Sequence, residues 1–138
     1  MLPGIWIGDK RVKKNITIAD WSACKPLSAT LAIAEPYTAC KEGCAVIENQ
    51  AEISGKVAVI GCGDSIPLAQ KAQAAQTAGA VGVIFVNDDE TKADDTAPMD
   101  GDGTTVDITV AMVSYNEGTR IKALGANASV VFTGRSLR

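Results

Sequence analysis

A chain of 138 residues, 46% of them hydrophobic and 4% aromatic, is long enough for one domain with a core of small aliphatic side chains. Its net charge of −3 argues against a nucleic-acid partner, and no apolar run reaches the ~18 residues of a membrane span. The absence of histidine excludes Ser-His and Cys-His catalysis and histidine-based zinc sites.

The N-terminal part predicts short strands joined by polar loops. An edge strand is expected around Trp6, and further strands over 16–19 and 31–34. Residues 1–30 are predicted to be an extension of the same domain as residues 31–138.

Residues 55–87 predict one βαβ unit. The runs 56–60 and 81–86 are short, apolar and rich in β-branched residues, which is typical of parallel strands covered on both faces. Parallel neighbours require a crossover, and a helix over 67–78 with Gly79 after its last turn supplies it. The helix face expected to pack on the sheet consists of Leu68, Ala72, Ala75 and Gly79.

The turn Gly61-Cys62-Gly63 lies between this strand and this helix, where a nucleotide-binding G-x-G-x-x-G loop would lie. Ile66 occupies the position of the third glycine, and the first acidic residue after the next strand, Asp88, lies beyond the ~20-residue offset of a ribose ligand. A nucleotide- or phosphate-binding domain therefore stays open as the alternative function.

The segment 88–107 holds eight of the sixteen acidic residues. Asp100 to Gly103 resembles the opening of a calcium loop, but Thr104 and Ala111 stand where an EF-hand needs ligands. We therefore predict no metal site, and expect a solvated loop at the C-terminal edge of the sheet.

A strand over 108–113 is followed by a helix with a specific start signal. Ser114 and Glu117 have the spacing of a capping box, in which each side chain bonds the backbone amide of the other residue. Ile121 and Leu124 are expected to form the buried stripe of this helix, which Gly125 ends. A last strand is expected over 128–133.

These segments together resemble the protease-associated (PA) domain. Residues 55–63 (GKVAVIGCG) resemble its G-K-[IV]-x-[LV] strand and turn, 71–80 (KAQAAQTAGA) its K-x-x-x-A-q-x-A-G-A helix, and 81–88 its V-I-[IV]-x-N strand. Residues 34–40 (AEPYTAC) resemble its A-[DE]-P-x-x-A-C segment, and 107–118 its stretch ending in I-P-V-V-M-I-S-x-x-x-G.

The resemblance spans 31–132, with its landmarks in the right order. Three positions depart from the family pattern: Cys62 replaces an Arg in the turn, 65–68 replaces a C-x-F segment, and Thr109 replaces a Pro. Disulfide and turn contacts of the family therefore do not transfer directly.

The resemblance implies an α/β fold, a PA-type β/β/α layered domain with a parallel βαβ core, two main helices and additional strands from the N-terminal half. It also implies a non-catalytic protein- or peptide-interaction module without cofactors. Such modules occur in larger secreted, luminal or membrane proteins, including proteases, sorting receptors, ubiquitin ligases and mannosidases. The expected partners are a protein, a peptide or other domains of the parent chain. No nucleic-acid partner and no direct membrane insertion by this segment are expected. The expected location is extracellular or in the secretory lumen. A passive spacer within a larger enzyme is a further alternative.

The turn over 61–65 and the acidic loop over 87–107 are the implied partner-binding surface. The candidate residues are Gly61, Gly63, Asp64, Ser65, Asp88, Asp89, Glu90, Asp94, Asp95, Met99, Asp100 and Asp102. Met99 is expected as an apolar contact among the carboxylates.

A secretory setting makes disulfides the expected use of the four cysteines, Cys24, Cys40, Cys44 and Cys62. We expect Cys62 to pair with Cys40 or Cys44, with Cys24 bonded to the other, and the sequence does not choose between these pairings. In a reducing compartment the alternative is four buried thiols. Asn15 and Asn127 begin glycosylation sequons.

Overall fold

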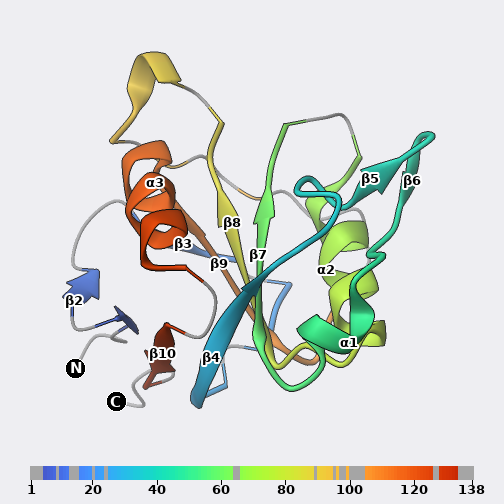
Figure 1. Ribbon diagram of the computed structural model, residues 1–138, viewed down its shortest axis with the longest axis horizontal. Helices are drawn as coiled ribbons and strands as arrows, with labels where there is room; N and C mark the ends of the chain where they lie inside the picture. The colour runs from blue at the N-terminus through green and yellow to red at the C-terminus, as the bar shows by residue number, and fades with distance from the viewer. Residues whose placement is uncertain are drawn as a thin grey trace.

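The computed structural model describes residues 5–8, 10–12, 16–19, 21–23, 25–63, 66–88, 90–94, 96, 99, 105–125 and 128–133. Within these ranges one large mixed sheet dominates the fold (Figure 1). The order of its strands is β2 (Lys10–Val12), β1 (Ile5–Ile7), β10 (Ser129–Phe132), β4 (Leu27–Ile33), β7 (Val57–Gly61), β8 (Gly82–Val86), β9 (Thr109–Val113) and β3 (Ile16–Ile18). The strand around Trp6 is β1, and the expectation of an edge strand is wrong, because β2 pairs with its outer side.

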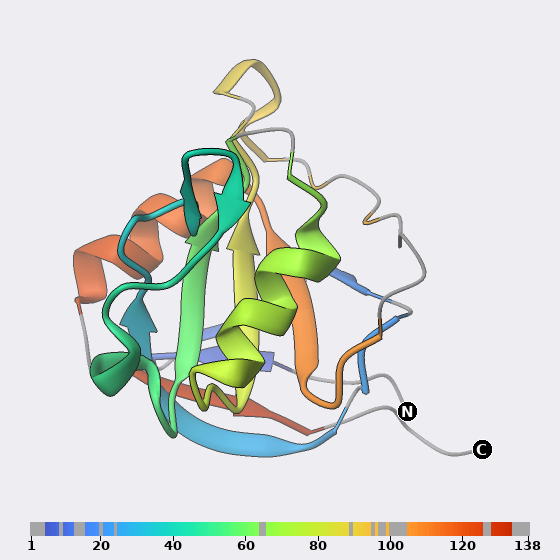
Figure 2. The ribbon, with the colours of Figure 1, turned by 90° about the vertical axis from the view of Figure 1, so that its right-hand side faces the viewer.

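Strand β4 joins two halves of the sheet. Its residues 27–30 pair antiparallel with β10, whereas residues 31–33 pair parallel with β7. The half that holds β10 runs crosswise to the parallel strands β7 and β8 (Figure 2). The bend at β4 therefore turns one sheet into two β layers.

Each side of the parallel strands faces its own core. One core lies between the two β layers and includes Ile7, Val59 and Phe132. The other lies between the parallel strands and the helices α1 (Gln50–Ile53) and α2 (Leu68–Thr77). This arrangement confirms the expected β/β/α layering.

The βαβ unit is confirmed. β7 and β8 are parallel in the register Val57↔Gly82 to Gly61↔Val86, and α2 connects them. The buried residues of α2 are Ala69, Lys71, Ala72 and Ala75, whereas Leu68 is half-buried and Gly79 is exposed. The packed face is thus rotated from the expected one, and it includes a lysine.

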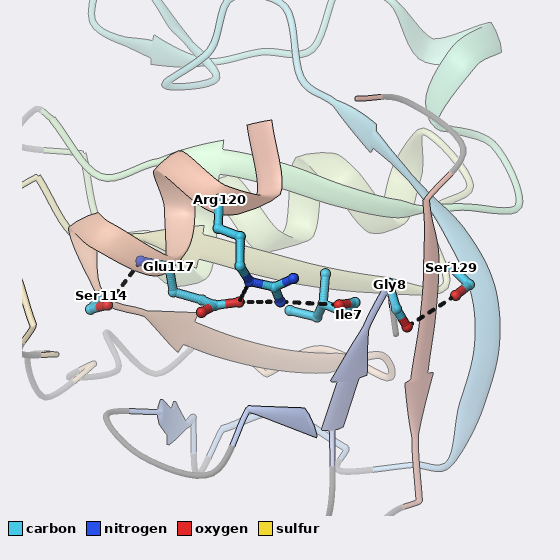
Figure 3. A network of polar contacts seen from close by, with 6 residues as sticks. All are labelled: Ile7, Gly8, Ser114, Glu117, Arg120 and Ser129. Atoms are coloured by element: carbon cyan, nitrogen blue, oxygen red, sulfur yellow. Dashed lines mark hydrogen bonds and ion pairs between the residues drawn. The ribbon is translucent and has the colours of Figure 1, made fainter. Parts of the chain in front are cut away.

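Helix α3 (Tyr115–Leu124) lies on the other side of the parallel strands from α2 (Figure 1). The Ser114 hydroxyl accepts a hydrogen bond from the Glu117 amide at 3.1 Å, as expected of a capping residue. The Glu117 carboxylate does not complete the box, because it binds Arg120, whose guanidinium also donates to the Ile7 carbonyl at 3.0 Å (Figure 3). Ile121 is buried, but Leu124 is 45% exposed, so the predicted buried stripe is wrong at its last residue.

Three small elements complete the described structure: a hairpin of β5 (Cys40–Lys41) and β6 (Cys44–Ala45), and a 3₁₀ turn, η1 (Glu90–Lys92). No helix in the described ranges is long and apolar enough to cross a membrane.

Candidate partner-binding site

A small pocket lies where β7 and β8 end, beside α3. Its volume is ≈ 100 Å³. Four segments line it, with the residues Tyr37, Thr38, Gly61, Cys62, Gly63, Val86, Asn87, Asp88, Tyr115 and Lys122. The carboxyl ends of parallel strands are where open α/β sheets meet ligands, so the position is typical of a binding site.

The two glycines of the turn make room for the segment that follows β4. A Cβ at position 61 would lie 2.5 Å from Cε2 of Tyr37, and one at position 63 would lie 2.9 Å from Cγ2 of Thr38. The Gly61 amide also donates to the Tyr37 carbonyl at 2.8 Å. Gly61 therefore lets the tyrosine ring lie directly on the end of β7, and Gly63 leaves room for the Thr38 methyl group.

Lys71 holds the same turn from the α2 side. Its side chain is 0% exposed, and Nζ donates to the Cys62 carbonyl at 2.8 Å and to the Gly61 carbonyl at 3.4 Å. A buried ammonium group requires such partners, because an unsolvated charge is costly. Lys71 thus fixes one wall of the pocket from behind.

This geometry disfavours a nucleotide site. Small-molecule sites usually enclose ~300–1,000 Å³, several times the volume of this pocket. Tyr37 and Thr38 occupy the space beside Gly61 and Gly63 that a pyrophosphate would need. The lysine of α2, Lys71, is engaged with the carbonyls of the turn, so it is not directed at a phosphate in the pocket.

Tyr37 is one of the residues that line the pocket. Its hydroxyl is buried and, among the described residues, has no hydrogen-bond partner. Burial, and secondarily the neighbouring Cys62 and Tyr115, raise the pKa of Tyr37 to about 12. The Lys122 ammonium lies 4.7 Å from the centre of the Tyr37 ring, within the range of a cation–π contact. At neutral pH the group is an uncharged, buried hydroxyl.

The structure brings three of the expected binding residues together in the pocket: Gly61, Gly63 and Asp88. Glu90 and Asp94 are exposed in the neighbouring loop, where the Asp94 carboxylate accepts from the Asn116 side chain at 2.8 Å. The backbone amide of Asn116 also donates to the Ala93 carbonyl at 2.9 Å. The two bonds hold the loop against the start of α3.

Met99 does not lie on the surface as expected. It is 6% exposed within the core beneath α2, and its carbonyl accepts from the Trp21 indole at 2.9 Å. The remaining candidates lie outside the described residues: Asp64, Ser65, Asp89, Asp95, Asp100 and Asp102.

No disulfide joins the three cysteines within the described ranges, and Cys24 lies outside them. In the hairpin, Cys40 pairs with Ala45 and Cys44 pairs with Lys41, so the two thiols point to opposite faces of the hairpin. A bond between Cys40 and Cys44 is therefore disfavoured, and the pairing with Cys62 stays a prediction. Both sequon asparagines, Asn15 and Asn127, also lie outside the described ranges.

Sequence reasoning missed half of the lining. The missed residues are Tyr37, Thr38, Val86, Tyr115 and Lys122; they come from three separate segments, and none belongs to a motif that specifies a ligand. The sequence did contain a signal for the role of Lys71. It is the one charged residue of α2, and a charge on the buried side of a helix needs a partner inside the protein.

A family model described as the PA domain matches residues 26–121. Two relatives share the name ER degradation-enhancing alpha-mannosidase-like protein 3. The Xenopus laevis protein is 42% identical over 87 residues, 60% of this chain, and the Homo sapiens protein is 41% identical over 75 residues, 51% of this chain. The matched parts amount to 9% and 8% of the length of those proteins.

Two solved structures share the fold. A zinc aminopeptidase from Bacillus subtilis superposes with a TM-score of 0.71 at 23% identity, over 95% of this chain and 29% of the peptidase. A subtilisin-like protease from Pseudoalteromonas sp. AS-11 gives a TM-score of 0.66 at 15% identity, over 98% of this chain and 33% of the protease.

Proposed function

Because the chain belongs to the PA domain family, we propose that it is a non-catalytic module that binds a protein or peptide segment at the Tyr37 pocket. The observation that carries the proposal is the pocket itself, built from four segments at the ends of β7 and β8. Its volume of ≈ 100 Å³ suits one side chain of a partner, whereas a nucleotide needs more room.

Catalysis by this chain alone has little support. The sequence contains no histidine, and Asp88, a carboxylate that lines the pocket, is exposed. A general base has to be held within hydrogen-bond reach of the proton it takes, which an exposed loop carboxylate does poorly. A binding role needs no such group.

The relatives suggest the setting. Both are named as ER degradation-enhancing alpha-mannosidase-like proteins, so we propose that this chain is a domain of a larger protein in the endomembrane lumen. Its partner would be a protein client or another domain of the same parent. The predicted disulfides and glycans would fit this location.

A selection of displayed random decapeptides on the intact chain, followed by NMR titration, tests the proposal. Bound peptides are expected to shift the amide signals of Gly61, Gly63, Val86 and Asn87. Selected peptides that shift amides only elsewhere would contradict the location, and failure to select any binder would contradict the binding role. Thermal denaturation with NAD, FAD and ATP is the matched control, and none of the three is expected to raise the melting temperature.

A further inference from the structure

A broad groove lies between α2 and the β5–β6 hairpin. Its volume is ≈ 760 Å³, within the ~300–1,000 Å³ that is typical of ligand sites. The consecutive residues 43–47 form one wall, and residues of α2 between Gln70 and Thr77 form the other. Figure 2 shows the hairpin and α2 on the same side of the parallel strands. The groove shares no described residue with the Tyr37 pocket, so it is a separate site.

The hairpin wall of the groove is the outer edge of β6. Successive side chains of an extended strand point to opposite faces, so a groove lined by five consecutive residues runs along the edge of the strand rather than over one face. β6 is also the strand of the hairpin that packs beside α2. A ligand in the groove would therefore lie next to the main chain of β6.

Ala45 turns both of its main-chain hydrogen-bonding groups away from β5. The Val46 amide donates to the Ala39 carbonyl at 2.9 Å, and bonded pairs alternate with non-bonded pairs in an antiparallel ladder, so the next pair, Cys40↔Ala45, is non-bonded. The N–H and C=O of Ala45 have no hydrogen-bond partner in the described part of the chain. Because Ala45 lines the groove and is only half-buried, this residue is a template for an added strand.

The groove is rich in amide groups and carries no charge. All four glutamines of the chain line it, and among the described residues no charged side chain does, although 21% of the chain is charged. A carboxamide both donates and accepts hydrogen bonds, as does a peptide main chain, in which N–H and C=O alternate. A charged ligand would lose its hydration here without gaining an opposite charge.

Two of these amides are already oriented by the protein. Oε1 of Gln76 accepts from the Asp107 amide at 2.6 Å, which leaves the NH₂ group of Gln76 as a donor. Nε2 of Gln50 donates to the Ile47 carbonyl at 3.3 Å, which leaves the oxygen of Gln50 as an acceptor. Gln73 is exposed on the α2 wall and has no side-chain partner in the described part of the chain. The groove thus presents both donors and acceptors to a ligand.

We propose that this groove binds an extended, uncharged polypeptide segment, which adds to the β5–β6 hairpin as a third strand at the edge of β6. The main chain of the segment bonds the N–H and C=O of Ala45 on one side and the side-chain amide of Gln73 on the other. Strand addition satisfies both outward groups of Ala45 at once, which favours a polypeptide over an oligosaccharide. This second site does not depend on binding at the Tyr37 pocket.

Selection of displayed decapeptides without charged residues on the wild-type chain, followed by NMR titration, locates the site. Bound peptides are expected to shift the amide signals of Ala45, Val46 and Gln73 and to leave those of Gly61 and Asn87 unchanged. N-methylation of each main-chain amide of the best peptide in turn then tests recognition of the main chain. Methylation of the amide that donates to the Ala45 carbonyl is expected to lower the affinity about tenfold, close to the worth of one hydrogen bond.

Ala45→Pro tests the protein side of the same contact. It removes the outward N–H, and it costs the hairpin no hydrogen bond because that N–H points away from β5. The affinity for the selected peptide is expected to fall about tenfold. The matched control is Ala45→Gly, which keeps the N–H and is expected to change the affinity less than about threefold. Gln73→Ala is expected to weaken binding severalfold, whereas Thr119→Ala, at an exposed polar residue of α3, should not.

Several outcomes would overturn the inference. Equal affinities of the wild-type chain and Ala45→Pro, or tolerance of a methyl group at every peptide amide, would rule out strand addition; the second result does not depend on the folding of any variant. Peptides that shift only Gly61 and Asn87 would refute the groove and support the Tyr37 pocket. Mannotriose that shifts the groove amides when no uncharged peptide does would make the ligand class wrong. Failure to select any uncharged peptide would also refute the groove, whereas the proposed function is decided by its own selection of random peptides.

Discussion

Tyr37 and Tyr115, the two tyrosines of this chain, both line the pocket, yet burial acts strongly on Tyr37. Its pKa is raised from 10.0 to about 12, chiefly because burial penalises the phenolate. In the variant Tyr115→Phe, absorbance of the tyrosinate ion is therefore expected to appear with a midpoint near pH 12. A midpoint near 10 would mean that water reaches the hydroxyl freely.

The same shift predicts the direction of a stability change. A group whose pKa is raised by folding favours the folded state below its unfolded pKa, and this contribution is lost as the pH rises toward the folded pKa. The free energy of unfolding should therefore fall between pH 10.0 and about 12, and Tyr37→Phe should remove that part of the decline. Other alkaline groups titrate in both proteins, so the difference between the two curves is the quantity to compare.

The role of Gly61 is steric, because its lack of a side chain makes room for the Tyr37 ring. Alanine at this position would place a methyl group 2.5 Å from the Tyr37 ring, and the surrounding backbone is held by hydrogen bonds. Gly61→Ala is expected to lower the free energy of unfolding by ~1–3 kcal/mol, the usual cost of overpacking, as measured by urea denaturation. In a Tyr37→Ala background the same change should cost markedly less, and an equal cost in both backgrounds would contradict the contact.

Sequence patterns located Gly61 and Gly63 but not the reason for them. A glycine-rich turn after a strand is compatible with a phosphate, a tight turn or a close side chain, and a single sequence does not distinguish these. The deciding neighbours, Tyr37 and Thr38, are more than twenty residues away along the chain. Which side chain lies against a glycine depends on the tertiary structure, so a local sequence pattern does not predict it.

At the scale of elements, Lys71 couples α2 to the turn of β7. Replacing it with methionine keeps an unbranched side chain but leaves the carbonyls of Gly61 and Cys62 without this donor. Lys71→Met is expected to lower the free energy of unfolding by ~1–3 kcal/mol, the cost of losing a buried polar partner. The control is Lys25→Met, at an exposed lysine, with an expected change within about 0.5 kcal/mol. An equally small change at Lys71 would contradict its role.

Periodicity predicted the elements well where the pattern was long. The strands β7, β8 and β9 and the helices α2 and α3 lie within a residue or two of the expected bounds, because apolar runs and cap residues act locally. The prediction from local patterns failed where a tertiary contact determined which partner a side chain binds. Arg120 draws Glu117 away from the capping box by bridging to Ile7, a residue of β1 that no local pattern links to α3.

For the whole molecule, the strands outside the family match are part of the same sheet. The match covers 26–121, whereas β1, β2, β3 and β10 lie wholly outside it. Ile5, Ile7, Val130 and Phe132 on these strands are each at most 5% exposed. Figure 3 shows a further tie, in which Arg120 of α3 reaches the Ile7 carbonyl, and Gly8 is bonded to Ser129.

A fragment limited to residues 26–121 is therefore expected not to fold cooperatively. Burial of one large apolar side chain is worth ~1.5–3 kcal/mol, so losing four of them removes an amount comparable with the ~5–15 kcal/mol that stabilises a whole domain. Thermal denaturation of the fragment should show no sharp transition, whereas the full chain should show one. A cooperative transition in the fragment would contradict our prediction that residues 1–30 belong to the same domain as the rest.

The charge of the molecule bears on how it meets a partner. The net charge is −3, and the exposed carboxylates Asp88, Glu90 and Asp94 lie at or near the pocket. Such a surface attracts basic segments over distances that salt screens, since the Debye length is ~10 Å at 0.1 M salt.

Association of a basic peptide, measured by surface plasmon resonance, should slow severalfold between low and high salt, while its dissociation rate should change little. Asp88→Asn should reproduce part of this slowing at low salt, and an exposed carboxylate far from the pocket, as in Glu52→Gln, should not. Association rates that are indifferent to salt would leave the Tyr37 pocket as the sole source of recognition and would contradict the electrostatic contribution.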